Sequence, residues 1–239
     1  MKKRADVFLF ENGFYPSREK GKQAIEMGRV KVNDVTISKP SFEVDESDKI
    51  VTLPFEFVSR GGFKLQRALE DFGIDLSGKI VLDIGASTGG FSDVCLQNGA
   101  KKIYAVDTGA GQLADKIKND KRVKNFEKTN YLIFDKSNFS DVNFVVIDVS
   151  FVSLTKLIPK LSSDFEKVEI VALIKPQFEC GVEYAKKHKG VVKDKKIHEI
   201  IVEKIKNNFE EFNFVCKNIT KSSLLGGDGN VEFLIYLKK

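Results

Sequence analysis

The stretch that decides the fold is IVLDIGASTGGFSDVCL, residues 80–96, in which an apolar run ends in an acid and then breaks into glycines. The apolar residues 80–84, bounded by turn signals, predict a buried strand. Gly85, Gly89 and Gly90 then allow a tight turn and a close approach of the backbone to a ligand. The helical pattern that follows would offer free N–H groups and a positive dipole end to a polar ligand. The stretch therefore predicts the first strand, loop and helix of a doubly wound α/β domain.

The rest of the C-terminal part alternates in the same way, which predicts a parallel sheet with right-handed crossovers. The last two expected strands are joined by LLGGDG with no helix between them, so they should form an antiparallel hairpin at one sheet edge. A parallel sheet closed by such a hairpin resembles the Rossmann-like α/β fold of class I methyltransferases, which use S-adenosylmethionine. The earlier strands are expected at 80–84, 101–107, 123–127, 142–148 and 168–174, and helices at 61–73 and near 89–98, 110–119, 153–161 and 195–208.

Residues 1–58 are predicted to form a separate, small α+β domain, and residues 59–239 the α/β domain. Ser17 can cap a short helix, and the pair Asn33-Asp34 between two alternating runs predicts a hairpin. The fragment SREKGKQAIEMGRVKVND resembles the alpha-L RNA-binding fold of a small-subunit ribosomal protein. That resemblance implies RNA binding, and a helical cap with charged faces is the alternative interpretation.

The net charge of +5 is concentrated in two stretches. Residues 1–31 carry eight Lys and Arg against four acids, and residues 184–196, YAKKHKGVVKDKK, carry six Lys against one Asp, so the remaining chain is net acidic. Two basic patches on an acidic protein are typical of a surface that contacts a phosphate backbone, and ordinary solvated surface is the alternative. The candidate RNA-contact residues are Arg4, Arg18, Lys20, Lys22, Arg29, Lys31, Arg60, Lys189 and Lys193.

Several protein classes are disfavoured by composition. No apolar segment approaches the roughly 20 residues of a membrane span, and the start MKKRADVFLFENGF lacks the apolar run of a secretory signal. Three widely spaced cysteines predict neither a disulfide framework nor a zinc cluster, and they suit a reducing cytoplasm, so no metal is expected. His188 and His198 are predicted to lie at the surface rather than to act as ligands or bases.

The glycine loop reads D-x-G-x-x-x-G-G and lacks the G-x-G-x-x-G fingerprint of dinucleotide sites. Asp83 at the strand end can bind an ammonium group and would repel a pyrophosphate, while Asp107, 22 residues after Gly85, can bind ribose hydroxyls. A ligand with one ribose, an amino acid part and no phosphate fits both acids, which favours S-adenosylmethionine over a nucleotide cofactor. The candidate cofactor residues are Asp83, Gly85, Ala86, Ser87, Thr88, Gly89, Gly90, Phe91 and Asp107, with Thr129 and Asn130 for the adenine.

Chain direction predicts a second group at the same sheet edge. Asp148 and Lys175 end parallel strands, Glu232 begins the antiparallel last strand, and Lys64 lies on the helix that enters the domain. Two lysines and two carboxylates suit methyl transfer to a weakly acidic ribose 2′-OH. Lys175 would act as the base, and Asp148 would orient Lys175 and lie near the methyl group, while Lys64 and Glu232 would hold the hydroxyl. Surface ion pairs are the alternative interpretation of each residue.

An ordered set of motifs carries a closer resemblance over nearly the whole chain. VSRGGFKLQRAL, VLDIGASTGGFSD, AVDTGAGQL, VIDVSFVSL, LIKPQFE, KGVVKDKKIH and GGDGNVEFL follow one another as in the TlyA (hemolysin A) family. The resemblance implies 2′-O-methylation of cytidine in ribosomal RNA by a Lys–Asp–Lys–Glu tetrad, which matches Lys64, Asp148, Lys175 and Glu232. The chain resembles the shorter form of the family, which favours the large ribosomal subunit over both subunits.

Two other functions stay open at this level. The name hemolysin suggests a membrane-damaging protein, although the sequence has no strongly apolar helix face beyond what a core needs. The second is an RNA-binding ribosome-assembly factor whose methyltransferase domain is inactive, against which the intact glycine loop, Asp107 and the complete tetrad argue.

Overall fold

The computed structural model describes residues 2–239, and contacts within the chain group the residues up to Glu56 into one unit and Phe57–Lys239 into another. In the first unit Ser17 accepts a hydrogen bond from the backbone N–H of Lys20 at 3.2 Å and caps the second helix, as predicted. Asn33 and Asp34 adopt positive φ values of 50° and 67°, as a two-residue hairpin turn requires.

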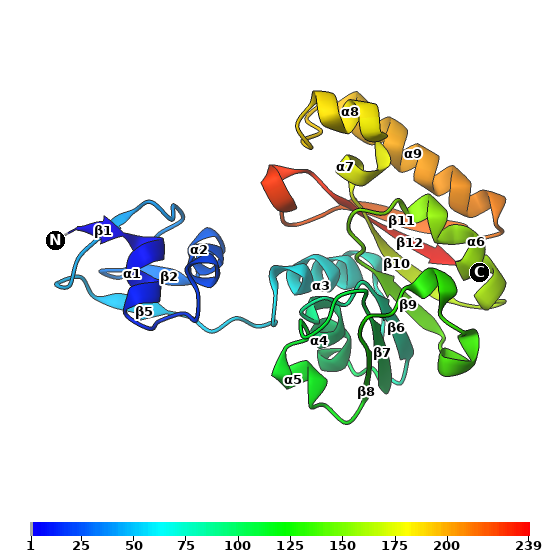
Figure 1. The fold of residues 1–239 in the computed structure, drawn as a ribbon, viewed down its shortest axis with the longest axis horizontal. Helices are drawn as coiled ribbons and strands as arrows, with labels where there is room; N and C mark the ends of the chain where they lie inside the picture. The colour runs from blue at the N-terminus through cyan, green and yellow to red at the C-terminus, as the bar shows by residue number, and fades with distance from the viewer. Residues whose placement is uncertain (1) are drawn as a thin grey trace. The chain divides into compact units, whose positions relative to one another are not determined.

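Two helices pack on small sheets in this unit (Figure 1). Its described strands form a three-stranded sheet in the order β3-β2-β5 and a separate pair, β1-β4. The pair was not predicted, because strands of two residues leave no alternating pattern in the sequence. The elements are β1 (Lys3–Arg4), α1 (Ala5–Glu11), α2 (Arg18–Glu26), β2 (Val30–Val32), β3 (Val35–Thr36), β4 (Glu43–Val44) and β5 (Ile50–Thr52).

The second unit is built on a seven-stranded sheet of described residues in the order β11-β12-β10-β9-β6-β7-β8 (Figure 1). Strands β10, β9, β6, β7 and β8 are parallel, whereas β12 runs antiparallel to both β10 and β11. The α/β fold and its edge hairpin are therefore confirmed. The strands are β6 (Ile80–Ile84), β7 (Lys102–Val106), β8 (Val123–Phe126), β9 (Phe144–Ile147), β10 (Glu169–Ile174), β11 (Val215–Lys221) and β12 (Phe233–Lys238).

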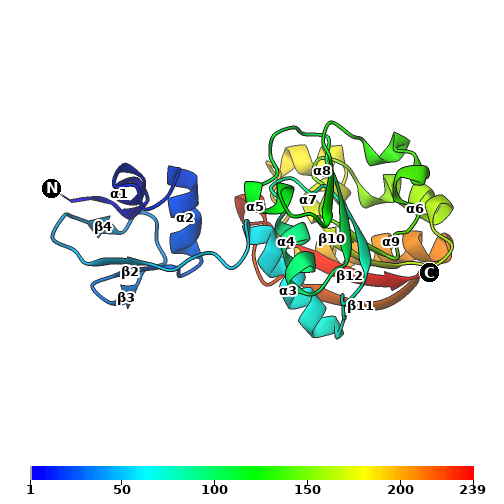
Figure 2. The same ribbon diagram turned by 90° about the horizontal axis from the view of Figure 1, so that it is seen from below.

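Helices cover both faces of this sheet (Figure 2). Leu82 and Ile84 of β6 join one core cluster together with residues of α6 and α9, while Val81 joins the other with residues of α3, α4 and α5. This alternation explains the uninterrupted apolar runs, because both faces of a central parallel strand are buried. The helices are α3 (Arg60–Phe72), α4 (Gly90–Gln97), α5 (Asp115–Lys118), α6 (Ile158–Asp164), α7 (Pro176–Glu179), α8 (Val182–Lys187) and α9 (Lys195–Glu211).

Three local predictions differ from the structure. The helix expected near 110–119 is only the four residues of α5, since Gly111 has a φ of 66°. The helices α7 and α8 were not predicted, although Pro176 is well suited to the first position of α7. The surface prediction for His198 is wrong: its side chain is buried, Nε2 lies 2.8 Å from the carbonyl oxygen of Val192, and its ring packs edge-on against Phe233.

Candidate active site

A cavity of about 480 Å³ lies at the carboxyl ends of β6, β7 and β9, where the sheet predicts a ligand site. Its volume is in the range of small-molecule sites. Among the predicted residues, the cavity is lined by Gly85, Ser87, Asp107, Thr129, Asn130 and Asp148. Its wall also contains Thr108, Gln112, Tyr131, Leu132, Ser150 and Phe151, which the sequence interpretation did not single out.

Asp107 follows the end of β7 and is fixed by backbone donors. Its Oδ2 accepts a hydrogen bond from the N–H of Ser87 at 2.8 Å, and its Oδ1 accepts one from the N–H of Gly109 at 2.7 Å. Each carboxylate oxygen can accept a further bond. The side chain therefore presents a preoriented pair of acceptors to the cavity, suited to the adjacent hydroxyls of a ribose.

Asp83 lies behind the cavity rather than in its wall. Its side chain is fully buried, Oδ2 accepts a hydrogen bond from the Ser92 hydroxyl at 2.7 Å, and Oδ1 has no hydrogen-bond partner among residues 2–239. Burial raises the pKa of Asp83 to about 7, although the hydrogen bond from Ser92 opposes that rise. Ser92 on α4 holds Oδ2, Asp83 lies outside the wall of the cavity, and its contact with an ammonium group stays a prediction.

The glycines of the loop serve close packing within the protein. Gly85 has a φ of 86°, and a Cβ atom there would lie 2.6 Å from the carbonyl oxygen of Asp148, so the loops after β6 and β9 meet at this position. The other predicted loop residues build the turn into α4 without lining the cavity: Ala86, Thr88, Gly89, Gly90 and Phe91.

Thr129 and Asn130 line the cavity but also stabilise their own turn. The Thr129 hydroxyl donates to the carbonyl oxygen of Glu127 at 3.0 Å, and Asn130 Oδ1 accepts from the N–H of Leu132 at 3.0 Å. The amide nitrogen of Asn130, a cavity-lining side chain, can donate a hydrogen bond to a ring nitrogen of an adenine.

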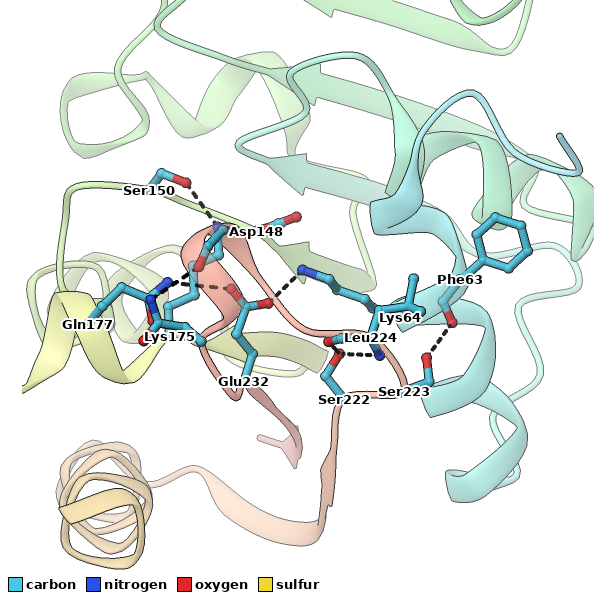
Figure 3. Close-up of polar contacts among 12 residues, drawn as sticks. Phe63, Lys64, Asp148, Ser150, Lys175, Gln177, Ser222, Ser223, Leu224 and Glu232 are labelled. Carbon is cyan, nitrogen blue, oxygen red and sulfur yellow. Dashed lines mark hydrogen bonds and ion pairs between the residues drawn. The ribbon is translucent and has the colours of Figure 1, made fainter. Parts of the chain in front are cut away.

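The four residues of the predicted tetrad form two ion pairs (Figure 3). Lys64 Nζ on α3 lies 2.5 Å from Glu232 Oε2, just before β12. Lys175 Nζ, at the end of β10, lies 2.6 Å from Asp148 Oδ1 and donates to the Ser150 hydroxyl at 2.9 Å. Asp148 Oδ1 makes no aligned hydrogen bond, so its contact with Lys175 is an ion pair of charges in close approach.

The two pairs differ in exposure. The Glu232 side chain is 2% exposed, whereas that of Asp148 is 23% exposed and lines the cavity. Gln177, which follows Lys175 by two residues, places its Nε2 3.5 Å from Glu232 Oε1 (Figure 3). The sequence interpretation missed Ser150 and Gln177, although both lie within two residues of a predicted tetrad member.

Glu179 connects the segments that follow Asp148 and Lys175, the ion pair that includes the more exposed carboxylate. It is buried on α7 and accepts hydrogen bonds from the Ser153 hydroxyl at 2.5 Å and the N–H of Leu154 at 2.8 Å. Burial raises the pKa of Glu179, and the hydrogen bonds from Ser153 and Leu154 oppose that rise. The segment after Lys175 is thereby tied to the segment after Asp148.

Several predicted RNA-contact residues already have protein partners. Arg4 and Arg18 each bond to the buried Asp6 at 2.9 Å. Burial alone would raise the pKa of Asp6, but the hydrogen bonds from both arginines outweigh it and hold the pKa below its usual value. The partners and exposure of the rest are as follows: Arg29 pairs with Glu56 at 3.2 Å, Lys20 lies 5.9 Å from the centre of the Phe55 ring, Lys31 and Arg60 are half-buried, and Lys22, Lys189 and Lys193 are exposed.

The described part of the chain contains neither a membrane-spanning helix nor a cluster of metal ligands. Between residues 2 and 239 no helix has the length and apolar character to cross a membrane. In the same range no group of three or more His, Cys, Asp or Glu side chains is arranged to hold a metal ion.

A doubly wound parallel sheet closed by an antiparallel hairpin, with a cavity over its strand ends, defines the class I methyltransferase fold. Residues 57–239 match the family model of the FtsJ-like methyltransferases, and residues 3–50 match the S4 domain. The chain therefore belongs to the FtsJ-like methyltransferase family and carries an S4 domain at its N-terminal side.

Relatives agree with this assignment over most of the chain. The chain is 42% identical to a Bacillus subtilis protein named "Putative rRNA methyltransferase YqxC", over 99% of this chain and 85% of that protein. It is 35% identical to "16S/23S rRNA (cytidine-2'-O)-methyltransferase TlyA" of Mycobacterium tuberculosis, over 98% and 89%. A solved structure described as "Putative hemolysin from Streptococcus thermophilus" is 38% identical, covers 100% of this chain and 88% of its own, and has a TM-score of 0.76. The predicted resemblance to the TlyA family is confirmed.

Proposed function

We propose that this protein transfers a methyl group from S-adenosylmethionine to the ribose 2′-OH of a cytidine in ribosomal RNA of the large subunit. The observation that carries the proposal is Asp148 in the wall of the cavity, paired with Lys175, together with the second pair Lys64–Glu232. The M. tuberculosis relative is named for this reaction on both subunits. The resemblance to the shorter family form favours the large subunit here.

The donor set of the cavity fits S-adenosylmethionine. Asp107 offers two oriented acceptors for ribose hydroxyls, and Asn130 offers an amide for the adenine. The acidic wall, with Asp107 and Asp148, would repel the phosphates of a nucleotide cofactor. When bound, the cofactor supplies an electrophilic methyl group on a sulfonium centre.

The tetrad can perform the proton transfer that the reaction needs. Lys175 first gives up a proton to solvent; its amine then takes the proton of the 2′-OH as the hydroxyl oxygen attacks in line, and Asp148 stabilises the ammonium group that forms again. Lys64 and Glu232 hold the hydroxyl together: the Lys64 ammonium group donates to a lone pair of the hydroxyl oxygen, and Glu232 keeps that ammonium group in place. The proton then passes from Lys175 to solvent, which is reachable through the open side of the cavity.

Binding of the RNA is assigned to the S4 domain and to the basic segment around α8. Lys22, Lys189 and Lys193 are exposed and can neutralise phosphates. Arg4 and Arg18, held by Asp6, are oriented rather than mobile, which suits bidentate contact with a phosphate.

The proposal is tested with labelled S-adenosylmethionine and isolated ribosomal subunits, each incubated separately with the purified protein, followed by mapping of the modified ribose. We expect labelled 2′-O-methylcytidine in the large subunit. Lys175→Ala should lower the rate by roughly 1,000-fold while RNA affinity stays within about twofold, since a general base contributes 10²–10⁴. The exposed Lys156, changed to Ala, is the matched control and should behave as the unchanged protein.

Three results would overturn this assignment. Label only in the small subunit would refute the subunit choice. RNA binding without methyl transfer would favour the inactive assembly factor. Dye release from liposomes in the absence of any cofactor would favour the membrane-damaging function.

A further inference from the structure

Glu232 is covered by the loop that leads into β12, residues 222–230 (Figure 3). The backbone N–H of Ser222 donates to the carbonyl oxygen of Glu232 at 2.9 Å, so the loop closes back on its own end. Within the loop the N–H of Gly226 donates to the carbonyl oxygen of Asn230 at 2.8 Å. These bonds bring the backbone of Gly226 against the Glu232 carboxyl group.

Gly226 has no room for a side chain. A Cβ atom there would overlap Oε1 of Glu232 and lie 2.5 Å from its Cδ. The backbone of Gly226 is extended, with φ −72° and ψ −167°, which any residue can adopt. Glycine is therefore required here by the position of the Glu232 carboxyl group and not by backbone conformation.

The carboxyl group is enclosed on its other sides. Lys64 Nζ lies 2.5 Å from Oε2 and Gln177 Nε2 lies 3.5 Å from Oε1. A methyl group at position 226 would clash with the carboxylate of Glu232, which lies at the end of a flexible side chain. The carboxylate would therefore move more easily than the backbone. Movement of Glu232 would break its contact with Lys64 or with Gln177.

The loop itself is anchored and has little freedom to retreat. Asn230 is buried, its Nδ2 donates to the carbonyl oxygen of Gly190 at 2.9 Å, and its Oδ1 accepts from the N–H of Val192 at 3.0 Å. These bonds tie the loop to the segment that follows α8. The displaced group would therefore be Glu232 rather than the loop.

We propose that Gly226 is a positioning residue for methyl transfer. Because glycine has no side chain, it leaves room for the Glu232 carboxylate to stay in its position beside the loop. This inference rests on the proposed function, in which Glu232 keeps in place the Lys64 ammonium group that binds the ribose hydroxyl. A displacement of about 1 Å at such a group lowers rates by roughly 100-fold.

The experiment compares Gly226→Ala with Gly227→Ala in the full-length protein, with methyl transfer to the large subunit as the assay. No described atom lies within 4 Å of a Cβ atom at Gly227, and its φ is not positive, so it is the matched control. We expect Gly226→Ala to lower kcat by about 10- to 100-fold with the KM for S-adenosylmethionine unchanged. Gly227→Ala should retain normal kcat.

A second background separates positioning from general damage. Glu232→Asp shortens the side chain by one methylene and withdraws the carboxylate, so Gly226→Ala should add less than about a threefold further loss in that background. Equal losses in both backgrounds, or normal kcat for Gly226→Ala, would overturn the inference.

Thermal unfolding is measured in the absence of substrate for the unchanged protein, Gly226→Ala, Glu232→Asp and the double variant. If Gly226→Ala changes the melting temperature in the unchanged background but not in the Glu232→Asp background, the contact between Gly226 and Glu232 is demonstrated. This result does not depend on methyl transfer, so a protein that shows it without any methyl transfer would refute the proposed function alone. Additive changes in melting temperature would refute the contact itself.

Discussion

The two ion pairs of the tetrad contain the same chemical groups in opposite surroundings. Lys64–Glu232 is closed, with the carboxylate under the loop 222–230, and Lys175–Asp148 is open to the cavity. A closed pair can hold an orientation but cannot easily exchange protons with solvent. The difference indicates a division of work, in which the closed pair orients the hydroxyl and the open pair moves its proton.

The largest difference is expected in stability. Lys64→Met leaves the buried Glu232 without a counter-charge and should destabilise the protein by about 3 kcal/mol, whereas Asp148→Asn should cost about 1 kcal/mol, because Asp148 is 23% exposed and the asparagine oxygen can still accept a hydrogen bond from Lys175. Urea unfolding followed by circular dichroism measures both. Equal losses for the two variants would show that the pairs do not differ in burial in solution.

The buried carboxyl group of Asp83 makes the stability of the protein depend on pH. The folded pKa of Asp83 is about 7, above its usual value near 3.8, so the folded state binds the extra proton between these values and stability is lost as pH rises through that window. Between pH 5 and pH 7 the contribution should fall by about 2 kcal/mol.

Asp83→Asn removes this titration while it keeps an acceptor for Ser92. The free energy of unfolding is measured at several pH values for the unchanged protein and for Asp83→Asn. From pH 5 to pH 7 the unchanged protein should lose stability relative to Asp83→Asn. A difference that does not change with pH would contradict the raised pKa.

The smallest effect is expected at the hydroxyl beside Lys175. Ser150→Ala removes one acceptor from the ammonium group but leaves Asp148 in place, so single-turnover methyl transfer should slow by about fivefold, the equivalent of one modest hydrogen bond. Ser150→Thr retains a hydroxyl and should restore most of the rate. A normal rate for Ser150→Ala would show that Asp148 alone orients Lys175.

The α/β fold was readable from the sequence because the inner parallel strands, such as β6, β9 and β10, are buried on both faces and end in turn residues. Chain direction alone put Asp148, Lys175 and Glu232 at one edge. The same reasoning could not foresee that Ser92 and the start of α4 seal Asp83 away from the cavity, since that depends on how closely the helix packs on the strand.

Contacts between loops were beyond the sequence for a similar reason. Ser150 and Gly226 touch the tetrad from irregular segments and Gln177 from the four-residue helix α7, and none of these has a periodic pattern in the sequence. The burial of His198 follows from packing of α9 against Phe233, which a helix pattern alone does not reveal. Sequence reasoning thus found the groups at strand ends and missed those that surround them.

The reversal of β12 has a consequence for folding. Lys64 and Glu232 are 168 residues apart, and they meet only when the reversed strand joins β10. Until that strand docks, Lys64 has no carboxylate partner, so intermediates that lack β12 are disfavoured and the strands are expected to form together. Methyl transfer should therefore return in refolding together with the pairing of β12 on β10.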